Sequence, residues 1–304
     1  MEKTALLVIA GPTASGKTSL AVELAKKYNG EIVSADSMQI YKRMNIGTAK
    51  PTKEEMGGIP HHMMDFLEPS ESYSVAEYVK AAHQVIADIK SRGKLPIVAG
   101  GTGLYINSLA DDVDFCETSD DGKIRAELTE KLEKEGIEAL ISELAECDPV
   151  SAEKIHPNNT KRVIRAIEFF RLNGTPISEQ GRDAENSRYN PLMLMINHPR
   201  ELLYERIEKR VDIMLDDGLI DEVKSLMRED LTKKHLSMQG IGYKEVIDHL
   251  RGFTTKDEMI RIIKRDTRRY AKRQLTWFNR DERMRKISGD ILAESSRLID
   301  EWKI

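Results

Sequence analysis

The amino-acid sequence predicts an α/β fold in which a parallel sheet is flanked by helices and interrupted by an all-helical insertion. In the first hundred residues, short apolar runs alternate with amphipathic helical stretches, and glycine-rich turns follow the apolar runs. From residue 119 to residue 173 the pattern is almost entirely helical. A strand–helix alternation of this kind builds a parallel sheet covered on both faces. Such sheets bind their ligands at the carboxyl ends of the strands.

The individual elements follow from apolar runs for strands and from a period of 3.6 residues for helices. Strands are expected at residues 4–10, 31–35, 95–99 and 192–196. The expected helices are 18–28, 74–90, 124–135, 137–145, 149–155, 160–172, 200–216, 220–227, 243–249, 255–278 and 291–302. We therefore expect an α/β core with C-terminal helices, residues 1–114 and 191–304, and a helical insertion domain, residues 115–190.

The composition is typical of a soluble, charge-rich globular protein. The 304 residues suffice for about two domains. Charged residues make up 32% of the chain, and no stretch approaches the ~18 uncharged apolar residues of a membrane span. Two cysteines, Cys116 and Cys147, are too few for a disulfide framework or a four-cysteine zinc site. A reducing cytoplasm without zinc is therefore the expected setting.

The net charge of −4 argues against general nucleic-acid binding, but the charge is unevenly distributed. Between residues 261 and 280, one acidic residue, Asp266, opposes eight basic ones: Arg261, Lys264, Arg265, Arg268, Arg269, Lys272, Arg273 and Arg280. A polyanion responds to this local field more than to the global sum. The other face of the same predicted helix carries Ile263, Thr267, Tyr270, Gln274, Trp277 and Phe278, which we interpret as a packing stripe.

A phosphate-binding motif lies between the first predicted strand and the first predicted helix. The pattern G-x-x-x-x-G-K-[ST] is matched by Gly11, Pro12, Thr13, Ala14, Ser15, Gly16, Lys17 and Thr18, here called the phosphate loop. Its glycines let backbone N–H groups surround an anion at the helix N-terminus. Lys17 then reaches the phosphate oxygens, and Thr18 offers its hydroxyl to Mg²⁺. The sequence therefore predicts a P-loop NTPase-like sheet with a diphosphate or triphosphate site.

Two further turns contribute polar side chains at the carboxyl ends of predicted strands. Asp36 follows the second strand, where it serves as a general base, as an outer partner of Mg²⁺, or as the cap of the next turn. Thr102 follows the 95–99 strand and offers a hydroxyl beside the phosphate loop. This turn lacks the carboxylate that an ATP hydrolase places there, which argues against hydrolysis or motor activity.

An ordered set of segments resembles the tRNA dimethylallyltransferases, bacterial type. Besides the phosphate loop, the matching segments are residues 34–41, 47–51, 60–62, 73–74, 100–105, 155–158, 161–166, 240–243 and 270–277. They run in order over nearly the whole chain. Some eukaryotic relatives carry a C-terminal zinc finger, which this sequence lacks.

The resemblance implies a chemistry. Dimethylallyl diphosphate would occupy the phosphate loop, and its dimethylallyl group would pass to N6 of adenine 37, next to the anticodon of tRNAs that read codons starting with U. Lys17, Thr18 with Mg²⁺ and Arg210 would neutralise the leaving pyrophosphate. By the same resemblance, Asp36 would take the N6 proton and Thr102 would steady the reacting end.

The resemblance also implies the partners. A monomer would bind dimethylallyl diphosphate and the tRNA anticodon stem-loop, and the target base would be extruded from its stack. The implied tRNA contacts are Asp36, Ser37, Met38, Gln39, Arg125, Lys161, Arg162, Val163, Ile164, Arg165, Gln239, Gly240, Ile241, Gly242, Tyr243 and Lys244. Whether ATP or another nucleotide competes for the phosphate loop stays open.

Two other enzyme classes share the phosphate loop. A small-molecule P-loop kinase would also carry an aspartate after the second strand, but it needs neither the helical insertion nor the basic helix. An adenylate isopentenyltransferase uses the same diphosphate site, but its acceptor is a free nucleotide. Such enzymes lack much of the tRNA-contacting apparatus that residues 161–165 and 240–244 resemble. A non-enzymatic RNA-binding module would explain the basic helix but not a complete phosphate loop.

Overall fold

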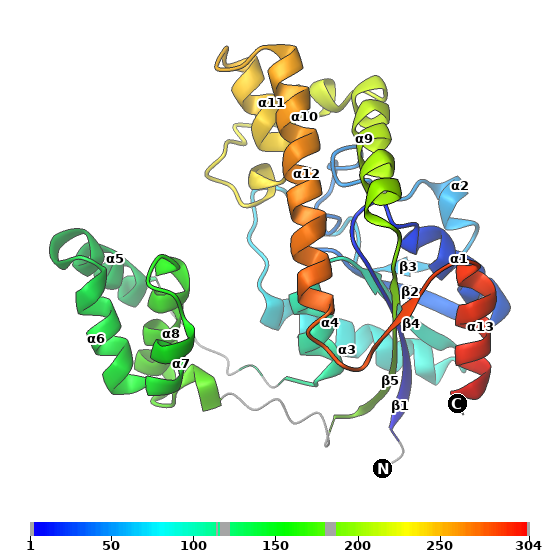
Figure 1. Ribbon diagram of the computed structural model, residues 1–304, viewed down its shortest axis with the longest axis horizontal. Coiled ribbons are helices and arrows are strands. Elements are labelled where there is room, and N and C mark those ends of the chain that lie inside the picture. The colour runs from blue at the N-terminus through cyan, green and yellow to red at the C-terminus, as the bar shows by residue number, and fades with distance from the viewer. Residues whose placement is uncertain (1–2, 114, 116–121, 180–186, 303–304) are drawn as a thin grey trace. The chain divides into compact units, whose positions relative to one another are not determined.

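The computed structural model describes residues 3–113, 115, 122–179 and 187–302. The chain forms two compact units, Met1–Asp111 with Ser187–Ile304, and Asp112–Asn186. They are called here the core unit and the helical unit (Figure 1). The second unit begins and ends a few residues before the expected boundaries at 115 and 190.

The core unit is built on one parallel sheet with the strand order β3-β2-β4-β1-β5-β6. Its strands are β1 (Thr4–Ala10), β2 (Gly30–Ala35), β3 (His61–His62), β4 (Leu95–Gly100), β5 (Tyr189–Ile196) and β6 (Met284–Ile287). The four predicted strands are confirmed. The sequence analysis missed β3 and β6 because these edge strands have two and four residues, too few to show a pattern.

The central strand β1 is buried on both faces, as parallel sheets require. Leu7 pairs with Ile97 on one side and with Leu192 on the other. Leu7 and Ile9 join the cluster that α1 (Lys17–Lys27) and α13 (Ile291–Glu301) cover. Leu6 and Val8 are equally buried and point to the opposite face because side chains alternate along a strand. A strand buried on both faces therefore needs a continuous run of apolar residues.

Three further helices of the core unit follow β2, β3 and β4 along the chain. Helix α3 (Val75–Ser91) contacts β2 and β4, and it packs on α4 (Gly103–Ala110). It begins at a capping box, in which Ser74 accepts from the N–H of Glu77 and the Glu77 side chain accepts from that of Ser74. The short helix α2 (Lys53–Met56) follows the long loop after β2. Helices α2 and α4 were not predicted.

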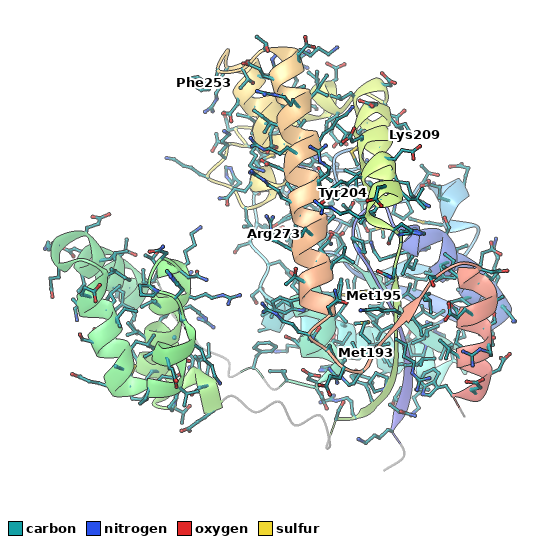
Figure 2. The ribbon with its side chains drawn as sticks, viewed as in Figure 1. Met193, Met195, Tyr204, Lys209, Phe253 and Arg273 are labelled. Atoms are coloured by element: carbon teal, nitrogen blue, oxygen red, sulfur yellow. The ribbon has the colours of Figure 1, made fainter. Side chains whose placement is uncertain are left out.

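Four C-terminal helices form a second apolar cluster next to the sheet. They are α9 (Arg200–Asp216), α10 (Leu219–Met227), α11 (Tyr243–Leu250) and α12 (Lys256–Phe278), all confirmed from the sequence. Helices α9 and α12 lie side by side (Figure 1). An ion pair of 2.7 Å joins Lys264 of α12 to Asp212 of α9. Tyr204 of α9 lies 5.9 Å from the Arg268 guanidinium (Figure 2).

The helical unit has its own core. Its helices α5 (Lys123–Glu135), α6 (Ile137–Cys147), α7 (Pro149–Lys154) and α8 (Thr160–Asn173) confirm the four predicted ones. Leu128, Leu140 and Leu144 are fully buried there with residues of α8. In neither unit does a described helix combine the length and the apolar character that crossing a membrane requires.

Candidate active site

A cavity of about 1050 Å³ opens at the carboxyl ends of β1, β2 and β4. The loops that follow these three strands line one side. Helices α1, α2, α9 and α12 and the segment 236–244 supply the rest of the wall. All of these residues belong to the core unit. The glycine-rich turns therefore meet where a parallel α/β sheet binds ligands.

The phosphate loop presents an uncapped helix N-terminus to this cavity. Gly16 is the N-cap of α1 with φ 92°, a left-handed conformation that favours glycine. No side chain caps the helix, and its first turn holds no acidic residue. The first backbone N–H groups of α1 therefore remain available to an anion. The Lys17 ammonium donates to the carbonyl of Pro12 at 2.7 Å.

Two cations converge on the loop under partial desolvation. Burial and, to a smaller extent, the nearby Arg210 lower the pKa of Lys17 to about 8, while Asp36 opposes the shift. Burial also lowers the pKa of Arg210, against the attraction of Glu55 and Asp36. Desolvated positive charge at the phosphate loop favours the binding of a polyanion, although the carboxylates of Asp36 and Glu55 partly offset it.

Side chains from the C-terminal half hold the phosphate loop in place. Arg210 donates to Thr13 Oγ1 at 3.2 Å, and Arg206 donates to the carbonyl of Ala14 at 2.9 Å. Further contacts come from His198 Nε2, 2.9 Å from the Ser15 carbonyl oxygen, and from Gln274, whose Oε1 accepts the N–H of Thr13 at 3.0 Å.

The sequence analysis singled out Arg210 but missed Arg206, His198 and Gln274. Gln274 was interpreted as part of a packing stripe. It is 6% exposed, and a buried polar side chain on an otherwise apolar face was the available signal.

The turn after β2 directs Asp36 into the cavity and fixes it. Asp36 Oδ1 accepts the N–H of Met38 at 2.9 Å and that of Gln39 at 3.4 Å. The turn-capping alternative is thus realised. Oδ2 accepts no hydrogen bond from any described residue, so the carboxylate keeps one oxygen for another task.

Thr102 supports this turn from the neighbouring strand. Its Oγ1 accepts the N–H of Ser37 at 3.0 Å and donates to Ser37 Oγ at 3.3 Å. The Thr102 side chain is not among the residues that line the cavity. Its observed contacts therefore position the loop that carries Asp36.

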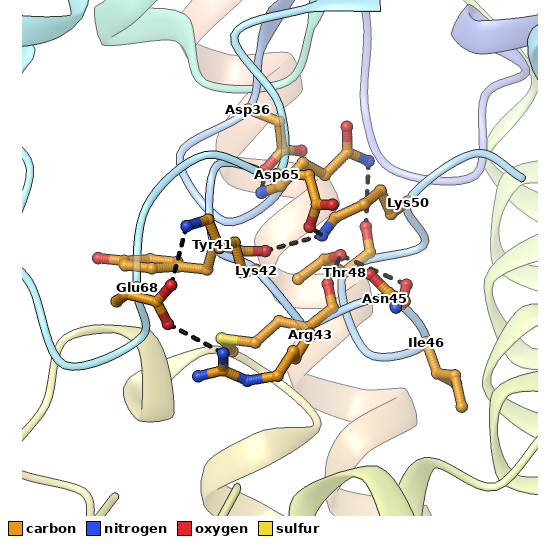
Figure 3. A network of polar contacts seen from close by, with 12 residues as sticks. Asp36, Tyr41, Lys42, Arg43, Asn45, Ile46, Thr48, Lys50, Asp65 and Glu68 are labelled. Atoms are coloured by element: carbon orange, nitrogen blue, oxygen red, sulfur yellow. Dashed lines mark hydrogen bonds and ion pairs between the residues drawn. The ribbon is translucent and has the colours of Figure 1, made fainter.

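The loop that continues from Gln39 lines the cavity with Gly47, Thr48 and Ala49, and a network of polar contacts holds it (Figure 3). The Gln39 amide donates to the carbonyls of Thr48 and Ala49 at 3.2 and 3.1 Å. The Glu222 carboxylate of α10 accepts three consecutive N–H groups, those of Asn45, Ile46 and Gly47, at 2.8, 2.8 and 3.1 Å. Lys50 closes the loop on the Tyr41 carbonyl and Asp65, at 2.7 and 2.6 Å. The wall is thus held by contacts within the protein.

Most tRNA contacts expected in the core unit line the cavity. These are Asp36, Ser37, Met38, Gln39, Gln239, Gly240, Ile241, Gly242 and Lys244. The Tyr243 side chain does not line the cavity: it is 1% exposed and donates to Glu222 at 2.7 Å, and its expected tRNA contact stays a prediction. Its position in the first turn of α11 points it into the apolar cluster rather than toward the cavity.

The expected contacts in the helical unit divide by exposure. Val163 and Ile164 are buried in its core because helical periodicity turns them inward. Their expected tRNA contact stays a prediction. Arg125 and Arg165 both pair with the buried Glu168, at 2.6 and 2.9 Å. Lys161 and Arg162 are exposed.

The basic helix α12 is more neutralised than its sequence suggested. Lys264 and Arg268 pair with Asp212 and Glu208 of α9, while Arg265 and Arg269 share Asp266. Counting charges along one segment could not reveal the two acids from another helix. The expected packing stripe is buried at Ile263 and Phe278, and part of it also lines the cavity, namely Ile263, Thr267, Tyr270 and Gln274.

These features define a phosphate-binding α/β protein whose C-terminal helices complete the wall of the site. The sequence matches the family described as IPP transferase over residues 39–281. A tRNA dimethylallyltransferase of Acetivibrio thermocellus is 50% identical over 300 residues, which cover 98% of this chain and 96% of that protein.

Solved structures agree with this match. The tRNA isopentenylpyrophosphate transferase of Bacillus halodurans has a TM-score of 0.74 at 43% identity, covering 99% of this chain and 97% of that one. A eukaryotic dimethylallyltransferase described as acting on tRNA has a TM-score of 0.77 at 34% identity, covering 90% and 70%. The chain belongs to the IPP transferase family of tRNA dimethylallyltransferases. The predicted family and the P-loop NTPase-like fold class are confirmed.

The lowered pKa of Lys17 predicts a pH dependence of diphosphate binding. An anion binds the charged ammonium, which is lost as the pH rises through about 8. We expect the affinity for dimethylallyl diphosphate, measured by calorimetry, to be about tenfold lower at pH 9 than at pH 7. Lys17→Arg keeps its charge and should give a flat profile, although with weaker binding. Equal pH dependence in both proteins would contradict the assignment to Lys17.

Proposed function

We propose that this protein transfers the dimethylallyl group of dimethylallyl diphosphate to N6 of adenine 37 in tRNAs that read codons starting with U. The products are N6-dimethylallyladenosine and pyrophosphate. The observation that carries the proposal is that a complete phosphate loop and the Asp36 carboxylate face one cavity. Family membership supports the same reaction.

The reaction needs stabilisation of a leaving group and orientation of a weak nucleophile. The N6 nitrogen attacks the allylic carbon, the carbon–oxygen bond breaks, and its electron pair leaves with pyrophosphate. Lys17 and Arg210 neutralise the charge that grows on this leaving group. An adenine amine is a poor nucleophile, so holding it in line with the allylic carbon supplies much of the rate.

We propose that Asp36 is the base that accepts the proton from N6. The support is its unengaged Oδ2 and the anchoring of Oδ1 on the N–H groups of Met38 and Gln39. Thr102 then acts through Ser37 by holding this turn in place. Its proposed role changes from steadying the reacting end to positioning the base.

Magnesium fits the oxygen donors of this site. The described residues contain no group of three His, Cys, Asp or Glu side chains that could hold a metal ion, so a protein cage for zinc or calcium is not formed by them. Mg²⁺ retains waters and binds one or two protein oxygens together with phosphate oxygens. We propose that Thr18 Oγ1 is its protein ligand, with Asp36 nearby. Bound there, the ion would neutralise charge on the diphosphate.

The size of the cavity and the loops at the side away from the phosphate loop support an RNA substrate. The volume of about 1050 Å³ exceeds what a five-carbon diphosphate needs, which leaves room for an extruded base. The β2 loop and the segment 239–244 would contact the anticodon loop. The exposed cations Lys161, Arg162 and Lys272 would meet its phosphates. Since tRNA is the substrate, we also propose a cytoplasmic location.

The proposal predicts which acceptor is labelled. With Mg²⁺ and labelled dimethylallyl diphosphate, unmodified bulk tRNA should take up label, whereas AMP should not. Lys17→Met should abolish transfer, and the matched control Lys27→Met, an exposed lysine at the other end of α1, should retain it. Label in AMP alone would make this a free-nucleotide prenyltransferase. Label in neither acceptor would favour a kinase and contradict the proposal.

The role of Asp36 is tested in a single turnover with saturating tRNA. If Asp36 takes the N6 proton, Asp36→Ala should slow the transfer step by about 10²–10⁴-fold, with dimethylallyl diphosphate still bound. Asp216→Ala, which removes an exposed aspartate near the end of α9, is the control. A rate within threefold of wild type would exclude the general-base role, whereas a loss restored by raised Mg²⁺ would point to a metal partner.

A further inference from the structure

A buried glutamine joins helix α12 to two of the turns that form the site. Gln274 lies between Ala271 and Phe278 on the inner face of the helix and is 6% exposed. Its Oε1 accepts the N–H of Thr13 at 3.0 Å, and its Nε2 donates to the carbonyl of Gly101 at 2.8 Å. A buried amide without partners would cost stability; here both ends of the amide are hydrogen-bonded.

Gly101, in the turn between β4 and α4, leaves room for this contact. A Cβ atom on Gly101 would lie 2.3 Å from Gln274 Nε2, while its next neighbours, Gln274 Cδ and the Gly11 carbonyl oxygen, would be 3.5 and 3.6 Å away. Only the amide group itself is therefore incompatible with a side chain at this position. Glycine at position 101 allows the glutamine to reach the carbonyl.

The contact to Thr13 fixes one residue of the phosphate loop from two sides. Gln274 takes the backbone N–H of Thr13, and Arg210 binds its hydroxyl at 3.2 Å. The bound N–H is directed at the glutamine, so Thr13 holds one orientation before any anion enters. A loop ordered in advance loses less conformational entropy on binding.

We propose that Gln274 is a positioning residue that pre-organises the phosphate loop for the diphosphate by bridging Thr13 to Gly101. The inference rests on the proposed use of dimethylallyl diphosphate at this loop. It adds to the reaction a residue that acts through the loop backbone. A purely space-filling role for Gln274 makes different predictions, because packing does not require the Gly101 carbonyl.

A double-mutant cycle separates the two roles. Gln274→Ala removes the bridge, and Gly101→Ala displaces the amide from the other side without deleting it. Each single change should raise the dissociation constant of dimethylallyl diphosphate about tenfold in calorimetry without RNA. The double variant should lose about the same factor rather than the hundredfold of independent effects. Turnover at saturating substrates should stay within about threefold, since a bound diphosphate orders the loop itself.

Two controls distinguish a loss of binding from a loss of folding. Gln84→Ala, an exposed glutamine on α3, should bind like wild type, and thermal unfolding checks that every variant is folded. Additive losses, or wild-type affinity in either single variant, would overturn the role of Gln274 while leaving the proposed function intact. A wild-type protein that binds no dimethylallyl diphosphate would instead refute the proposed function on which the inference rests.

Discussion

The candidate site depends on partly desolvated positive charge at the carboxyl ends of the sheet strands. Lys17 and Arg210 stand close together at the phosphate loop, and burial lowers the pKa of both. A flexible loop would collapse around these cations or let water reach them. Hydrogen bonds from α9, α12 and the segment after β5 prevent this by fixing three loop residues. The C-terminal half is therefore a structural part of the phosphate site.

The cavity has two chemically different ends, and a different set of hydrogen bonds holds each of them. At the phosphate end, side chains separated from the loop by 183 to 261 positions bind its backbone. At the other end, the Glu222 carboxylate holds three successive N–H groups and thereby the wall that contacts Gln39. Asp36 lies between these ends, which suits a group that must meet both a leaving diphosphate and an entering amine.

The parts that the sequence predicted are those whose cause is local. The strand β1 and the phosphate loop follow from an apolar run and a short motif, and α12 begins at the capping box of Thr255 and Glu258. Contacts between distant elements could not be foreseen. Asp212 and Glu208 neutralise Lys264 and Arg268 from another helix. Family resemblance likewise marked Val163 and Tyr243, but it could not distinguish an RNA contact from a buried core residue.

The central claim is that one cavity brings a diphosphate on the phosphate loop to a base beside Asp36. The most direct measurement is a crystal structure with an anticodon stem-loop and an unreactive thiolo analogue of dimethylallyl diphosphate. The account predicts the diphosphate on the N–H groups at the start of α1, the allylic carbon facing the flipped adenine, and Asp36 within hydrogen-bond reach of N6. A diphosphate bound elsewhere, or an adenine remote from Asp36, would contradict it.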